Sequence, residues 1–176
     1  VMDWSLSHKL TGETYDIYAA TFSKMTATMV AKTVKNLGNH FFSEKGVREL
    51  IKAMGSSGVA MCIAGSSRPA SGSEHLISHA LDLLSEEYSY KIQHGHQTGL
   101  ASILMLFLHG GDWNYAKDVL KEVNAPTTVK ELGIDRDIML EALKLAPTIR
   151  PDRYTILNAG LTREAAINAM EITGID

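Results

Sequence analysis

Four histidines in two short segments are the residues whose types and spacing could do chemistry. His75 and His79 stand one helical turn apart, Asp82 continues the same stripe, and His94 and His96 follow in the next helical segment. Because residues four apart share one helix face, and neutral imidazoles bind divalent cations, the spacing predicts convergence on one cation or one polar substrate. The same spacing is also typical of a solvated helix edge or of hydrogen-bonded core histidines.

The loop before the first pair, residues 65–73, is rich in serine and glycine. Ser71 is followed three residues later by Glu74, the capping-box pattern, so we expect a helix to begin near Gly72. The free N–H groups of a helix start, together with Arg68 in the loop, suit an approaching anion. Arg68 could equally brace the loop by bonding backbone carbonyls, and the sequence does not separate these two roles.

Helical periodicity dominates the chain and predicts an all-α fold, a helical bundle. On the helix that starts near residue 72, the buried stripe should hold Leu76, Ala80, Leu83 and Leu84. Glycine, proline and capping residues divide the rest of the chain. We expect helices over residues 14–37, 43–55, 59–64, 72–85, 94–109, 112–123, 127–133, 135–146 and 162–173, part of a helix within 3–10, N-caps at Asp112 and Thr162, and an extended crossing segment over 148–158.

Three smaller expectations concern packing. Cys62 is the single cysteine and lies in an apolar run, which predicts a small buried core residue. Met25 and Met29, one turn apart, are expected to pack adaptably in the core. Gly95 and Gly99 have the spacing that lets another helix backbone approach closely, which would bring the start of their helix towards the first histidine pair.

Composition restricts the class of protein. The chain has 176 residues and a formal net charge of -3, which suits one domain and argues against a general nucleic-acid or membrane-surface binder, since those partners require a basic field. No apolar run approaches the roughly 18 residues of a membrane span, and no signal peptide opens the chain, so we expect a cytoplasmic protein without membrane insertion. Residue 1 is Val, which suggests a piece of a longer protein.

Several motifs resemble the C-terminal domain of archaeal sn-glycerol-1-phosphate dehydrogenase, within the wider group of iron-containing alcohol dehydrogenases and dehydroquinate synthases. The most specific is the run Arg-Pro-Ala-Ser-Gly-Ser-Glu-His that ends at His75. Weaker matches are Ser-His-Ala-Leu-Asp at 78–82, His-Gly-His-Gln-Thr-Gly at 94–99, Asp-Trp at 3–4, Gly-Glu-Thr-Tyr at 12–15 and Arg-Pro-Asp-Arg-Tyr-Thr-Ile-Leu at 150–157. The likeness therefore covers nearly the whole chain.

The resemblance implies that residues 1–176 form the helical metal- and substrate-binding domain of a dehydroquinate-synthase-like fold. The N-terminal dinucleotide-binding domain of that fold is expected to be absent here, because no Gly-x-Gly-x-x-Gly turn follows a strand. The family implies a zinc ion held by two histidines and one aspartate. By motif position His75 and His94 correspond to the histidine ligands and His79 to a substrate contact, while His96 stands where relatives often carry Glu.

The third ligand is expected upstream of this chain, in preference to Asp82. We therefore expect the isolated chain to bind zinc weakly and to lack dehydrogenase activity. The whole enzyme would use NAD or NADP, bound mainly by the N-terminal domain, to interconvert dihydroxyacetone phosphate and sn-glycerol 1-phosphate for archaeal membrane lipids. Arg68 and the amides of residues 71–73 are candidate donors to the substrate phosphate, and a homo-oligomer is an open expectation.

Other functions stay open at this point. A glycerol dehydrogenase or a bacterial nickel-dependent glycerol-1-phosphate dehydrogenase would hold nickel or iron in place of zinc, and imidazole ligands suit all three metals. A dehydroquinate-synthase-like lyase should need more basic residues around its site than Arg68 alone. A non-catalytic helical module would keep the packing without the cofactor half.

Overall fold

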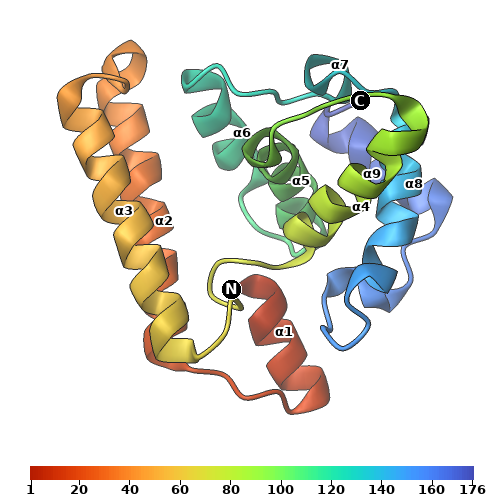
Figure 1. Ribbon diagram of the computed structural model, residues 1–176, viewed down its shortest axis with the longest axis horizontal. Helices are drawn as coiled ribbons and strands as arrows, with labels where there is room; N and C mark the ends of the chain where they lie inside the picture. The colour runs from red at the N-terminus through yellow and green to blue at the C-terminus, as the bar shows by residue number, and fades with distance from the viewer. The chain divides into compact units, whose positions relative to one another are not determined.

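The protein consists of helices, as its periodicity predicts. A computed structural model describes all 176 residues except the side chain of residue 86, and its described residues contain helices and turns without strands (Figure 1). The chain divides into two compact units, Val1–Gly72 and Ser73–Asp176. Among the described helices, none combines the length and the apolar character needed to cross a bilayer.

The first unit is a short helix followed by a long helical hairpin. Its elements are α1 (Met2–Thr11), α2 (Ile17–Leu37), the 3-10 helix η1 (Gly38–His40) and α3 (Glu44–Ala64). Helices α2 and α3 lie side by side, red-orange against gold in Figure 1. Asp16 caps α2 by accepting a 2.8 Å hydrogen bond from the Ala19 amide, and the indole of buried Trp4 donates to the Thr14 carbonyl at 2.8 Å. These bonds set the entry from α1 into the hairpin.

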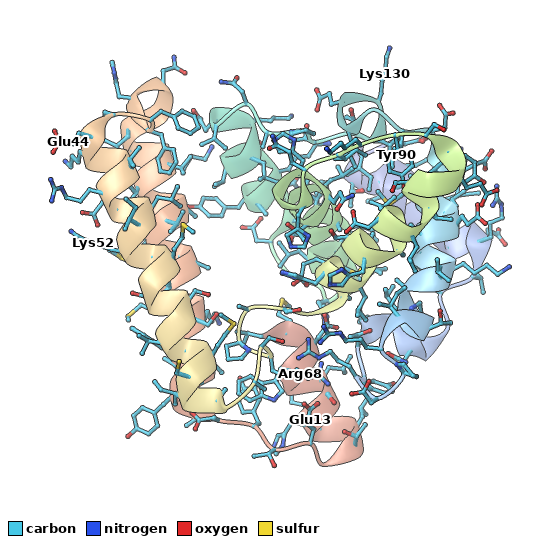
Figure 2. The ribbon with its side chains drawn as sticks, viewed as in Figure 1. Glu13, Glu44, Lys52, Arg68, Tyr90 and Lys130 are labelled. Carbon is cyan, nitrogen blue, oxygen red and sulfur yellow. The ribbon has the colours of Figure 1, made fainter. Side chains whose placement is uncertain are left out.

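A buried ion pair joins the two loops of this unit. The Arg68 side chain is only 4% exposed, and its Nε lies 2.7 Å from Oε1 of Glu13 while Nη2 donates to Oε2 of the same carboxylate (Figure 2). Ser7 also donates to that carboxylate. This two-point bond links the loop after α1 to the loop after α3.

The expected helix end at Gly55 is wrong, because α3 continues to Ala64 and absorbs the separate segment expected over 59–64. A glycine inside a helix costs only about 1 kcal/mol, and packing of α3 along α2 over its whole length outweighs that cost. Cys62 is exposed rather than buried, and Met25 and Met29 are more than half exposed. The expectation of core positions for these three residues is therefore wrong in this structure, since two helices alone bury only one face of each.

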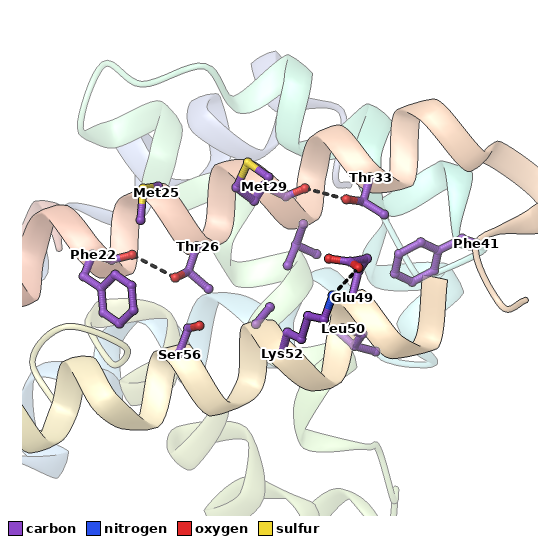
Figure 3. Close-up of a pocket in the computed structure, with 12 residues that line it drawn as sticks. Phe22, Met25, Thr26, Met29, Thr33, Phe41, Glu49, Leu50, Lys52 and Ser56 are labelled. Carbon is purple, nitrogen blue, oxygen red and sulfur yellow. Dashed lines mark hydrogen bonds and ion pairs between the residues drawn. The ribbon is translucent and has the colours of Figure 1, made fainter. Parts of the chain in front are cut away.

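A hollow of about 140 Å³ lies between α2 and α3, and Figure 3 shows the residues around it. Thr26 and Thr33 line it, but each hydroxyl donates to a carbonyl of its own helix. Lys52 pairs with Glu49 at 2.7 Å. These four side chains are thus committed to structural bonds, and we place no chemistry there.

The second unit is a helical bundle in which α5 contacts α4, α6, α7 and α9. Its elements are α4 (Ser73–Tyr88), α5 (His94–Leu108), α6 (Trp113–Glu122), α7 (Val129–Leu132), α8 (Arg136–Ile149), the 3-10 helix η2 (Ile156–Ala159) and α9 (Arg163–Thr173). Helix α4 packs against both α5 and α8 (Figure 1). The largest buried apolar side chains of its core are Leu76, Ile77, Leu81, Leu100, Ile103, Leu104, Met139, Met170 and Ile175.

Two-sided packing widens the buried face of α4 beyond the expected stripe. Leu76, Ala80 and Leu84 are buried as predicted, but Leu83 is 62% exposed and the buried face extends instead to Ile77 and Leu81. The prediction was wrong at Leu83 because a helix covered by two neighbours buries adjacent positions as well as those three or four apart. Helix α4 also runs three residues beyond the expected end at 85.

The capping residues expected at two helix starts of this unit act as predicted. Asp112 accepts from the Tyr115 amide and Thr162 from the Ala165 amide. The expected stop before Pro147 is wrong, because α8 continues to Ile149 with the proline in its last turn, where its missing N–H removes one i→i−4 backbone bond. The expected extended segment over 148–158 is correspondingly shorter and ends in η2.

The close-approach expectation is wrong at both glycines of α5, because no backbone atom of another helix lies within 4 Å of a Cβ placed at either one. A Cβ added at Gly99 would lie 3.4 Å from a methyl of Leu120 on α6, an ordinary contact distance, whereas at Gly95 it would meet nothing within 4 Å. A side chain, and not a helix backbone, therefore approaches Gly99. Gly99 therefore lies at the contact between α5 and α6, and the spacing of the two glycines does not explain how α5 packs against α4.

Candidate functional site

Three imidazoles from α4 and α5 come together in the second unit. His75 and His79 lie on the first two turns of α4, and His94 is the first residue of α5. The ring centres of His75 and His94 are 5.1 Å apart, and those of His79 and His94 are 6.1 Å apart. The described ring contacts of this cluster involve these three residues and not His96. Residues from two helices thus meet as the sequence pattern predicts. The hydrogen bonds and charges around the three rings indicate what the cluster can bind.

His94 is held by a chain of side-chain hydrogen bonds. Its Nδ1 lies 2.8 Å from Oγ of Ser78, which in turn donates to Oε1 of Gln97. The Gln97 amide nitrogen donates to Oδ1 of Asp82 at 2.9 Å. Ser78 and Gln97 are 0% and 1% exposed, so the chain runs through the interface between α4 and α5 and fixes the plane of the His94 ring.

His75 is oriented by a carboxylate next to it in sequence. Its Nδ1 lies 2.7 Å from Oε1 of Glu74. Because a carboxylate accepts hydrogen bonds, Nδ1 carries the proton and Nε2 keeps its lone pair in the neutral ring. A histidine whose other nitrogen donates to a carboxylate is the usual arrangement of a metal ligand.

The spacing of the two rings fits a shared divalent cation. Zinc lies about 2.0–2.1 Å from a ligating histidine nitrogen, so two rings on one tetrahedral ion have centres about 5 Å apart. The separation of 5.1 Å between His75 and His94 matches this value, and the 6.1 Å between His79 and His94 exceeds it. Among the described residues, no group of three His, Cys, Asp or Glu side chains is arranged to hold a metal ion. A catalytic zinc site normally has three protein ligands.

His79 sits in an environment that favours its neutral form. Burial lowers the pKa of its imidazole, and the nearby charge of Asp82 only partly opposes this effect. Electrostatic interactions with His94, Arg150 and His75 lower the pKa of His79 further. A neutral imidazole can both donate and accept a hydrogen bond, so His79 suits an uncharged hydroxyl or carbonyl group better than it suits an anion.

Arg68 takes a structural role in the first unit. Its guanidinium is bound at two points to Glu13, as described above. Of the two roles left open by the sequence, the structure supports bracing, although a carboxylate takes the place expected for backbone carbonyls. Arg150, whose charge acts on His79, is the cation of the second unit that sequence reasoning missed.

Sequence reasoning also missed Ser78 and Gln97. Each stands three residues after a histidine of the cluster, His75 or His94, on the side of its helix that faces the neighbouring helix. A polar residue at a position where periodicity demands a buried side chain was the available signal, because a buried polar group is almost always hydrogen-bonded.

Curated relatives identify the family. No protein-family model matches the chain. It is 54% identical over 176 residues to a glycerol-1-phosphate dehydrogenase (NAD(P)+) of Pyrococcus furiosus, covering 99% of this chain and 49% of the relative. Proteins of the same name from Thermococcus kodakarensis and Methanothermobacter thermautotrophicus are 54% and 48% identical, again over 99% of this chain and 49% of each relative. The chain thus spans about half the length of the curated relatives it matches. By this similarity along nearly its whole length, the chain belongs to the archaeal glycerol-1-phosphate dehydrogenase family and corresponds to its helical C-terminal domain.

Proposed function

We propose that this chain is the metal- and substrate-binding part of an NAD(P)-dependent glycerol-1-phosphate dehydrogenase. The reaction would interconvert sn-glycerol 1-phosphate and dihydroxyacetone phosphate by hydride transfer between the cofactor and the carbon that bears the secondary alcohol. The observation that carries the proposal is the pair of imidazoles, His75 and His94, with ring centres 5.1 Å apart in a chain about half identical to enzymes of that name.

His75 and His94 would hold the metal ion, for which we propose zinc. The Nδ1 atoms of both rings are engaged with Glu74 and Ser78, which leaves the Nε2 atoms for the ion. When bound, the ion would act as a Lewis acid on the substrate oxygen and stabilise negative charge on it. We expect the third ligand, an aspartate, from the part of the enzyme outside this chain.

His79 would contact the substrate beside these ligands. Its pKa is lowered by burial, so the ring is neutral near pH 7 and can donate a hydrogen bond to the substrate or carry its alcohol proton. The charge of Arg150 acts on the same ring. We therefore assign Arg150, and no longer Arg68, as the candidate partner of the substrate phosphate, since a guanidinium matches phosphate oxygens well.

The remaining parts of the enzyme complete the proposal. NAD or NADP would bind mainly to the part of the enzyme outside this chain, which we propose to be a dinucleotide-binding domain. We also propose that the enzyme supplies glycerol phosphate for archaeal membrane lipids. A cytoplasmic location and assembly as a homo-oligomer are part of the same proposal. Isolated from the other half, the chain should bind zinc weakly and lack turnover, because it contributes two ligands and no cofactor site.

Three substitutions in the full-length protein test the assignment. His75→Ala and His94→Ala should each abolish metal content and turnover together, whereas His79→Ala should keep the metal and lose mainly turnover. His40→Ala, at an exposed position of η1, is the control and should change neither. Metal analysis by mass spectrometry also separates zinc from nickel or iron. Full metal content in His75→Ala and His94→Ala would overturn the assignment.

A further inference from the structure

The hydrogen-bond chain behind His94 has a defined direction. Asp82 presents a carboxylate, which accepts, so the Gln97 amide must turn its NH2 group towards it. The Gln97 carbonyl oxygen then faces Ser78 and can only accept, so the Ser78 hydroxyl donates its single proton there. What Ser78 has left for His94 is a lone pair, and the 2.8 Å bond between them therefore takes its proton from Nδ1 of the histidine.

Burial makes this direction difficult to reverse. Ser78 and Gln97 are 0% and 1% exposed, so water cannot replace a bond that points the wrong way. If the Gln97 amide were flipped, its oxygen would face the Asp82 carboxylate and its NH2 group would face Ser78. That arrangement sets two acceptors against each other, and an unmet buried polar group costs about 1–3 kcal/mol.

We infer that Asp82, Gln97 and Ser78 form a positioning relay that locks His94 in the tautomer with the proton on Nδ1. The relay keeps the lone pair of Nε2 directed towards the cluster, where His75 presents its own Nε2 by a different means, the bond to Glu74. Neither Ser78 nor Gln97 touches the substrate or the metal in this account. They act only through His94, and the purpose of the lock rests on the proposed function.

The lock predicts a loss of metal affinity when the relay is broken. Without a partner at Nδ1, the proton of a neutral histidine distributes between both nitrogens, and the ring loses its fixed orientation. Partners of this kind typically contribute 10–100-fold to metal affinity. Ser78→Ala removes the hydroxyl that joins Gln97 to His94, with the loss of one oxygen atom. Asp82→Ala removes the acceptor that holds the Gln97 amide in one orientation. Because Asp82 is exposed, this substitution leaves the core intact.

Nitrogen NMR of the full-length, metal-free protein with 15N-labelled histidines measures the tautomer directly. His94 should show a protonated Nδ1 and an unprotonated Nε2 in the unmodified protein, and a mixture in Ser78→Ala and in Asp82→Ala. Asp82→Asn should also weaken the lock, because the asparagine amide can present its NH2 group as well as its oxygen to Gln97. Ser85→Ala is the matched control on α4, since that hydroxyl donates to the backbone carbonyl of Asp82 and takes no part in the relay.

Zinc affinity, measured by competition with a chelator, is the second readout. We expect Ser78→Ala to bind zinc about 10–100-fold more weakly and Ser85→Ala to bind it unchanged. An unchanged His94 tautomer in both Ser78→Ala and Asp82→Ala would overturn the relay even if zinc binds. A tautomer that changes as expected in a protein that binds no zinc would support the relay and refute the proposed function instead.

Discussion

Replacing Glu13 by Gln should destabilise the first unit far more than an ordinary surface substitution. The change keeps the size of the side chain but removes the countercharge of Arg68, which is 4% exposed and cannot recover its hydration without moving. Breaking a buried ion pair from one side costs about 3–5 kcal/mol. Because the Glu13 side chain is 32% exposed and glutamine can still accept one hydrogen bond, we expect a loss at or below the bottom of that range, about 2–3 kcal/mol.

Hydrogen exchange of the full-length protein measures this loss where it occurs. The free energy of opening should fall for the amides of α1 and for those of the loop after α3, both of which are tied down by the ion pair. Glu44→Gln is the matched control, since it breaks an exposed pair with Arg48 at 2.9 Å, with 87% and 65% of the two side chains exposed. An exposed pair four residues apart on a helix contributes about 0.3–0.5 kcal/mol.

A double substitution separates loss of charge pairing from loss of packing. Glu13→Leu combined with Arg68→Met removes both charges and keeps apolar volume, and such replacements are often neutral or stabilising. We therefore expect the double variant to recover most of the stability lost in Glu13→Gln. The reasoning fails if Glu13→Gln costs no more than Glu44→Gln, or if the double variant is less stable than the single one.

Two further predictions concern packing in the first unit and ionisation in the second. Gly46→Ala should lower the free energy of unfolding by about 1–3 kcal/mol, because its Cβ would lie 1.8 Å from the Phe41 carbonyl oxygen. Gly55→Ala in the same helix meets no atom within 4 Å and should stabilise the protein by up to about 1 kcal/mol. Equal denaturation midpoints for the two variants would contradict this prediction. Burial raises the pKa of Tyr90 from 10.0 to about 12, so between these values the unfolded chain loses a proton that the folded chain keeps, and stability should fall as pH rises through that window. Tyr90→Phe should flatten this fall in urea unfolding, and an unchanged pH dependence would refute the assignment.

The amino-acid sequence was sufficient for local structure. The helix starts at Asp112 and Thr162 depend on side chains within one turn of each other. The same holds for the helical pattern that places His75 and His79 on one face. Local rules therefore predicted them correctly. The motif around His75 was also sufficient to point to the family, since it is a string of adjacent residues that needs no folded partner to be recognised.

Local rules failed where a neighbouring element decides the outcome. Gly55 and Pro147 usually interrupt helices, yet α3 continues past Gly55 because packing along α2 outweighs a small local penalty, and α8 continues past Pro147 for two more residues. Leu83 was expected in the core and is exposed, since the buried face of α4 is set by the positions of α5 and α8.

The sequence by itself thus determined the all-helical fold class, which face of α4 carries imidazoles and which family the chain resembles. Only the tertiary structure decided that Arg68 forms an ion pair with Glu13 and that His94 is hydrogen-bonded to Ser78, which in turn bonds Gln97. The reason is physical. The partner of a charged or polar group is chosen by which oxygen or nitrogen lies within about 3 Å of it, and residues far apart in sequence reach that distance only when the helices that carry them have packed.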